Sequence, residues 1–195
     1  MNVYFVIAII LVCLLLATAS VTSAISASDI YNTPSYNTNE GFQTAHGYLV
    51  IAAILGFSSL TVLLIILIVG GYAGDFTQEE ISLALLNKPV LTPADVKEIK
   101  EGEAVIESQT GIQLLIMIIF ILIILVTLVV GGLAAAAAIH MAGDNVASAA
   151  YTQAIIAAST ALGGTILLII AVIAFASIRS FREKELVEAK AKIKT

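Results

Sequence analysis

Charge and sulfur are both scarce in this chain. Charged residues make up only 12% of its 195 residues, tryptophan is absent, and Cys13 is the single cysteine. One cysteine excludes an intrachain disulfide, and with it the four-span families that depend on extracellular disulfides. Hydrophobic residues make up 59%, and the mean hydropathy is +1.04. These values exceed those of soluble globular proteins and predict an integral membrane protein.

Long apolar runs account for most of the sequence. The run 112–139 has no charge, and only Gln113 and Thr127 are polar. As a helix it would be about 42 Å long, more than the ~30 Å hydrocarbon layer of a bilayer. We therefore predict an all-α integral membrane protein that forms one domain, residues 1–195. Its four transmembrane helices, arranged as two hairpins, are expected at about 3–24, 48–71, 112–139 and 149–178.

The first run has two interpretations. Ala17-Thr18-Ala19 is typical of the small-residue cleavage site of a secretory signal, but Met1-Asn2 supplies no positive charge before the apolar core. The run is also long for a signal peptide, so we expect a transmembrane helix. Whether residues 1–24 are ever cleaved stays open.

A polar segment, residues 25–46, joins the first two spans and contains neither Lys nor Arg. It is rich in Asn, Thr and Ser, which favour loops over regular structure, and we expect an outer loop. Aromatic residues here either anchor the chain at the membrane interface or contact a partner protein. The candidates for partner contact are Tyr31, Tyr36 and Phe42.

A second polar segment, residues 75–110, joins spans two and three. Thr77 with Glu80 forms a capping box, and Thr92 before Pro93 marks another helix start. We expect a short amphipathic helical segment here that leads into the third span. The charged tail, residues 179–195, has opposite charges four residues apart and is expected to continue the fourth helix into water.

Charge distribution predicts the orientation. All nine Lys and Arg lie between spans two and three or in the tail, and none lies in segments 25–46 and 142–147. With four spans, the two basic segments fall on the same side of the membrane. The positive-inside rule then places both termini and residues 75–110 on the cytosolic side.

Small residues mark where transmembrane helices can approach closely. Such residues occur at helical spacing in spans three and four, near the turn that joins them, and glycines end span two. The predicted helix-packing residues are Gly131, Ala135, Ala138, Ala154, Ala157, Ala161, Gly164, Gly70 and Gly74. A further small-residue stripe in span one comprises Ala17, Ser20, Ala24 and Ala27.

No span carries a charged side chain, which an intramembrane enzyme, pump or ion-coupled carrier would need. We therefore predict no catalytic residue, no cofactor and no metal. His46 and His140, with Glu40 and Asp144 nearby, could in principle bind a metal. Their spacing is not that of metal ligands, so we favour a role for both histidines as anchors at the membrane interface. Hydroxyls that could either line a pore between copies or bond helices together are Ser59, Thr61, Thr127, Ser159 and Thr165.

The loop YNTPSYNTNE, residues 31–40, between uncharged Ile-, Ala- and Gly-rich spans resembles small multi-span membrane proteins of large icosahedral double-stranded DNA viruses. In those particles such proteins join the internal membrane to the capsid shell. The resemblance implies a non-enzymatic membrane anchor or scaffold, a minor capsid protein of a virion's internal membrane. No motif matches residue by residue, so no functional residue is carried over.

The expected partners are the lipid bilayer and other membrane or capsid proteins, with no nucleic acid. A homo-oligomer is left open. Two other functions also remain open, an accessory subunit of a larger membrane complex and an oligomeric pore.

Overall fold

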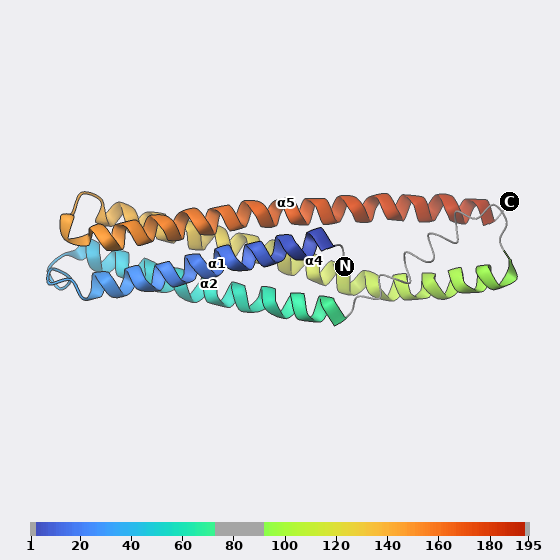
Figure 1. Cartoon of the computed structure of the whole chain (residues 1–195), viewed down its shortest axis with the longest axis horizontal. Helices are drawn as coiled ribbons and strands as arrows, with labels where there is room; N and C mark the ends of the chain where they lie inside the picture. Colours follow the sequence, from blue (N-terminus) through green and yellow to red (C-terminus); the bar gives the residue numbers. More distant parts are fainter. Residues whose placement is uncertain (1–2, 73–91, 194–195) are drawn as a thin grey trace.

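The computed structural model describes residues 3–72 and 92–193, and their regular structure is helical throughout (Figure 1). The elements are α1 (Val3–Tyr31), α2 (Glu40–Tyr72), α4 (Pro93–Met141), the 3-10 turn η1 (Asn145–Ala147) and α5 (Ser148–Ile193). Within these described residues, four stretches are long and apolar enough to cross a membrane: Val6–Tyr31, Glu40–Ile68, Leu115–Met141 and Asn145–Ala174. The predicted all-α class with four such helices is therefore confirmed.

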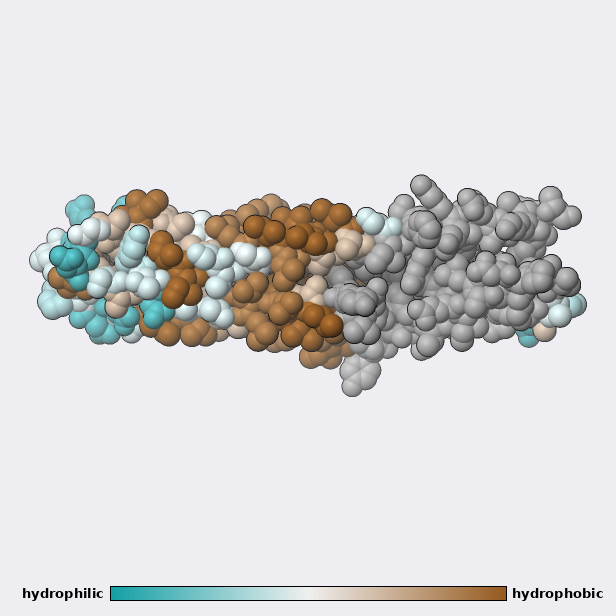
Figure 2. Space-filling view, turned by 45° about the horizontal axis from the view of Figure 1, so that its top comes forward, coloured by the Kyte–Doolittle hydropathy of each residue, from teal (hydrophilic) through white to brown (hydrophobic). Residues whose placement is uncertain are grey.

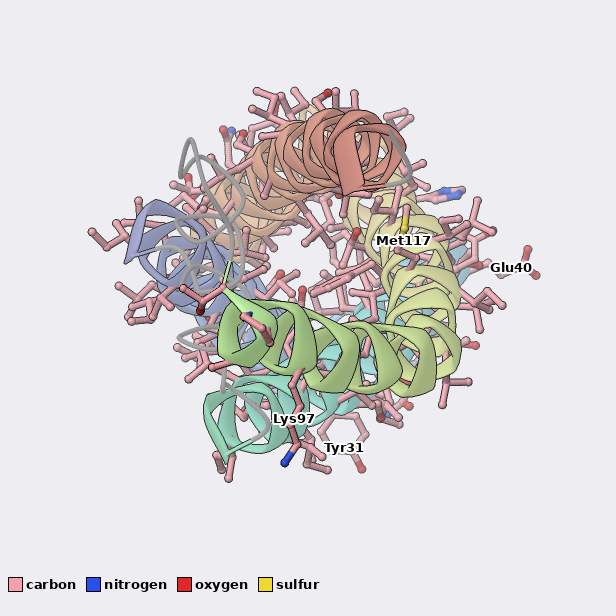
Figure 3. The ribbon with its side chains drawn as sticks, turned by 90° about the vertical axis from the view of Figure 1, so that its right-hand side faces the viewer. Tyr31, Glu40, Lys97 and Met117 are labelled. Carbon is pink, nitrogen blue, oxygen red and sulfur yellow. The ribbon has the colours of Figure 1, made fainter. Side chains whose placement is uncertain are left out.

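The four long helices lie side by side and form a ring when viewed from one end (Figure 3). Helix α1 packs against α2 and α5, and α4 packs against the same two helices. Each helix therefore has two main neighbours and turns one face toward the axis of the bundle. The chain reverses direction between α1 and α2 and between α4 and α5 at the same end, which we call the loop end (Figure 1).

The polar segment between the first two helices is shorter than the sequence predicted. We expected a loop over 25–46, but α1 continues to Tyr31 and α2 begins at Glu40, which leaves residues 32–39 as the connection. Packing explains the difference. Ser26 and Ile30 are both fully buried, so this serine-rich end of α1 gains core contacts that outweigh its weak helix propensity.

Helix α4 also differs from expectation. It begins at Pro93, directly after Thr92, as the capping signal predicted, but it then runs without a break to Met141. Within residues 92–141, a separate short amphipathic helix is therefore not seen before the third apolar stretch. The sequence between Pro93 and Met141 has no further proline to end the helix. The capping box at Thr77 and Glu80 lies outside the described residues.

The core changes character along the bundle. At the loop end the buried cluster is rich in alanine, including Ala137, Ala150 and Ala154, around the ring of Phe42. Toward the opposite end, the buried cluster consists mainly of bulky side chains. Its members are Ile9, Val12, Cys13, Leu16, Leu63, Phe120, Ile123 and Leu168.

The outer surface of the bundle is apolar over its middle. Figure 2 shows polar residues gathered at the loop end and hydrophobic ones beside them toward the centre of the molecule. Leu14, Ile54 and Ile166 are each 60% exposed. A belt of exposed large aliphatic side chains is the surface that lipid would cover.

Candidate functional site

The loop between α1 and α2 is ordered by its own hydrogen bonds. Asn39 accepts bonds from the backbone N–H groups of Gly41 and Phe42 through its Oδ1 atom, at 2.9 and 3.3 Å, and so caps α2. Gln43 Nε2, from the first turn of α2, donates to the carbonyls of Tyr36 and Asn37, both at 3.3 Å. These bonds fix the shape of the loop against the helix that follows it.

Three rings meet beside this loop. The ring centroids of Tyr31 and Tyr36 are 5.1 Å apart, and the His46 ring lies 5.6 Å from Tyr31 and 5.5 Å from Tyr36. Tyr36 Oη also lies 3.4 Å from His46 Nδ1, within hydrogen-bond range. Tyr31 remains 60% exposed. The cluster therefore holds the exposed Tyr31 side chain in a defined position. Aromatic side chains held in this way are common in protein contact surfaces.

The second turn of the loop end joins α4 to η1. Gly143 has a φ of +86°, a conformation that glycine adopts without strain, and the turn reverses the chain there. The Asp144 side chain accepts a 2.9 Å hydrogen bond from Val146 N and so caps η1. The His140 ring, in the last turn of α4, lies tilted at 48° to the ring of Tyr48 of α2, with centroids 5.9 Å apart.

The two histidines contact different tyrosines. His46 belongs to the ring cluster of Tyr31 and Tyr36, whereas His140 pairs with Tyr48. Within residues 3–72 and 92–193, no three His, Cys, Asp or Glu side chains gather as metal ligands would. Both histidines thus lie at the loop end beside tyrosines, the arrangement typical of an interfacial anchor.

All buried polar residues of the described chain carry hydroxyl groups. They are Ser20, Ser23, Ser26, Ser59, Thr127 and Thr165. Ser26 Oγ donates a 2.7 Å bond to the Ala150 carbonyl and thereby joins α1 to α5. Ser20 Oγ donates to the Leu16 carbonyl of its own helix at 2.7 Å. These groups can bond helices or bind a small polar ligand, but they offer no charge to a reaction.

The small-residue stripe predicted for span one differs from the face of α1 that is buried. The predicted stripe comprised Ala17, Ser20, Ala24 and Ala27 and did not include Ser23 and Ser26, but Ala24 is exposed and Ala17 is only partly buried. The face of α1 that is buried instead carries Ser20, Ser23 and Ser26, three residues apart. That spacing was visible in the sequence and could have identified the face.

Most of the predicted packing residues lie inside the bundle. Ala138, Ala154, Ala157 and Ala161 are buried, and Ala135 is partly buried against Ala134, Ala157 and Ala158. A Cβ atom added to Gly131 would lie 2.9 Å from Leu162 of α5. Gly164 instead faces α1, where an added Cβ would lie 3.4 Å from Leu15 Cβ.

Other predicted residues have different positions. Gly70 lies in α2, and Gly74 falls outside the described residues. Phe42 is only 1% exposed and belongs to the core, so its ring is not available to a partner in this structure. Partner contact stays a prediction for Tyr31 and Tyr36.

The residues suggested to line a pore do not share one surface. Ser59, Thr127 and Thr165 are buried in the core of a single bundle, whereas Thr61 and Ser159 are exposed on its outside. A channel between copies could use only the exposed pair from this set.

Fold and site together define a four-helix bundle whose helices can cross a membrane and whose loop end presents an ordered aromatic surface. Comparison with protein-family models, with curated proteins and with solved structures found no match to this chain.

Proposed function

We propose that this chain is a non-enzymatic, multi-pass membrane protein that anchors or scaffolds a protein assembly at a membrane. The observation that carries the proposal is the contrast between core and loop end. The buried polar side chains of the described residues are all hydroxyls, which serve packing, while Tyr31 is held exposed by ordered neighbours. Rigid aromatic side chains at an exposed position are favourable contacts for a protein partner.

The assembly favoured by the sequence resemblance is a viral capsid shell around an internal membrane. In that arrangement the four apolar helices cross the bilayer as two hairpins, and the loop end projects from its outer face. Support comes from the exposed aliphatic belt and from the polar residues gathered at one end of the bundle (Figure 2).

We further propose that both termini lie on the cytosolic or inner side. The loop end carries the acidic residues Asp29, Glu40 and Asp144, and segments 25–46 and 142–147 contain no Lys or Arg. The α4 segment with Lys97 and the end of α5 lie together at the opposite end of the bundle (Figure 1). Positively charged segments are retained on the cytosolic side during insertion.

Site-specific photo-crosslinking in the native membrane tests the anchor function. A photoreactive phenylalanine analogue placed at Tyr31 should capture one defined protein, because this side chain is exposed beside the ordered loop. The matched control is the same probe at Ile54, which is equally exposed but on the apolar belt, and should capture lipid. A purified chain that is monomeric, captures no protein through Tyr31 and turns over a substrate would refute the proposal.

Cysteine labelling tests the orientation independently. In a Cys13→Ala background, a membrane-impermeant maleimide should label Ser35→Cys from outside intact cells, since Ser35 lies in the connection between α1 and α2. Ala94→Cys, in the exposed first turn of α4, should react only after permeabilisation. The reverse pattern would contradict the orientation while leaving the anchor function standing.

A further inference from the structure

Ser23 stands apart from the other buried hydroxyls. Its side chain is 0% exposed, and its Oγ atom has no hydrogen-bond partner among the described residues. A buried hydroxyl in an apolar setting is unfavourable unless it is hydrogen-bonded, and buried polar groups in native proteins nearly always have a partner. Ser23 Oγ therefore needs a hydrogen-bond partner from outside the described residues.

The position of Ser23 follows from the two serines beside it. An added Cβ on Gly56 of α2 would meet the Ser20 side chain, so Ser20 faces α2. Ser26 bonds the Ala150 carbonyl, so it faces α5. Residues three apart in a helix are rotated by about 60° relative to one another. Ser23 thus lies midway between these two directions and points toward the axis of the bundle.

The core residues of α1 one turn before and one turn after Ser23 belong to apolar clusters. Ala19, one turn before Ser23, packs with Ala52, Val130 and Ala161. Ala27, one turn after it, belongs to the alanine-rich cluster of the loop end. Methyl groups neither donate nor accept hydrogen bonds, and no described carbonyl lies within hydrogen-bond geometry of Ser23 Oγ. A small ligand in this layer would supply the missing partner.

We propose that Ser23 binds a single internal water molecule, closed off from bulk solvent. Ser20 and Ser26 each donate their one hydroxyl proton to a carbonyl, which leaves lone pairs on both oxygens free to accept. Cβ atoms three residues apart on a helix are ~5–6 Å apart, and the hydroxyl oxygens that they carry can approach more closely. One water with two hydrogen bonds of ~2.8 Å can join oxygens up to ~5.6 Å apart. The water accepts from or donates to Ser23 and donates to Ser20 or Ser26, which gives the two or more partners that a buried water requires.

Water-to-protein magnetisation transfer in solid-state NMR tests the proposal, with the full chain in bilayers of deuterated lipid. We expect early transfer from water to the Ser23 side chain. The Thr127 and Thr165 side chains serve as the internal reference, because they are equally buried but bonded to each other. Absence of transfer at Ser23 would overturn the proposal. Equal transfer at all three residues would indicate a continuous water path and would overturn the closed site.

The variant Ser23→Ala gives a second readout. If water satisfies the hydroxyl, the variant should lose the transfer at this level of α1 and should unfold at a lower temperature. If the hydroxyl has no partner, its removal should raise the unfolding temperature, and if it bonds its own helix, there should be no water signal to lose. Either result would contradict the proposal. The matched control is Ser58→Ala on the exposed side of α2, where Ser58 Oγ bonds the Ile54 carbonyl.

Discussion

Thr165 Oγ1 of α5 donates a 2.8 Å hydrogen bond to Thr127 Oγ1 of α4 in the core of the bundle. Thr127 in turn lies 3.0 Å from the Ile124 carbonyl, to which its own proton is donated. Both threonines are essentially inaccessible. Since a hydroxyl has a single proton, the 2.9 Å contact of Thr165 with the Ala161 carbonyl is the alternative bond of the same group.

We predict that this bond between helices makes a modest contribution to stability. Thr165→Val keeps the volume of the side chain but removes the donor, and Thr127 retains its bond to the Ile124 carbonyl. Hydrogen bonds between helices in membrane proteins contribute ~0.6 kcal/mol on average and up to ~1.7 kcal/mol. A double-mutant cycle with Thr127→Val, measured as unfolding free energy in micelles, should give a coupling in that range.

The control for this cycle is Thr61→Val, because Thr61 is exposed and bonds the Phe57 carbonyl of its own helix. It should show no coupling to Thr165→Val. A coupling of zero between Thr127 and Thr165 would mean that Thr165 uses the Ala161 carbonyl instead.

Gly131 and Gly132, adjacent in α4, are a test position and a control position for the contact between α4 and α5. A Cβ on Gly131 would lie 2.9 Å from two carbons of Leu162, whereas a Cβ on Gly132 would meet nothing within 4 Å. Leucine at either position gains about the same helix propensity. We therefore predict that Gly131→Leu lowers the unfolding free energy by ~1–3 kcal/mol through overpacking, while Gly132→Leu does not lower it. Equal thermal stability of the two variants in detergent would contradict the close approach at Gly131.

The number of long helices and one of these two glycines could be predicted from the sequence. The apolar runs and their lengths were sufficient to predict four helices, because lipid-spanning segments must be long, apolar and helical. The sequence alone indicated Gly131 as a packing residue from its spacing with Ala135 and Ala138. It could not show which neighbour each small residue meets. Gly164 was grouped with the small residues near the turn between spans three and four, but it faces α1.

The sequence predicted the structure of the loop end least accurately. Local propensity placed residues 25–46 in a loop, but burial of Ser26 and Ile30 extends α1, and the Asn39 cap starts α2 at Glu40. Such contacts join residues far apart in the chain, which local patterns do not reveal. For the same reason Phe42 was grouped with Tyr31 as a surface residue, although it lies in the core.

Phe42 and Tyr31 should therefore respond differently to truncation. Phe42→Ala removes a ring that is 1% exposed and should lower the unfolding free energy by ~3–5 kcal/mol. Tyr31→Ala should change the unfolding free energy by much less, because most of its ring is exposed, but it should reduce capture of a partner by a photoreactive probe at the neighbouring Tyr36. Chemical unfolding and photo-crosslinking measure the two effects separately. A large loss of stability with Tyr31→Ala would assign this ring a structural role instead.

The contact between α1 and α2 depends on the absence of a side chain at Gly56. A Cβ there would overlap Ser20 Oγ, whereas a Cβ on Gly47 of the same helix would meet nothing within 4 Å. We predict that Gly56→Ala is destabilising, since overpacking costs ~1–3 kcal/mol and alanine returns up to ~1 kcal/mol of helix propensity. Gly47→Ala should be neutral or stabilising.

Removing the opposing hydroxyl should restore part of the loss. In Gly56→Ala combined with Ser20→Ala, the nearest approach becomes that of the two Cβ atoms at 3.3 Å, which a small shift of the helices can relieve. The double variant should therefore be more stable than the sum of the two single changes, as measured by unfolding free energy in micelles. Strict additivity would mean that the Ser20 hydroxyl can rotate away from α2, and the close approach of α1 and α2 would then not depend on glycine at this position.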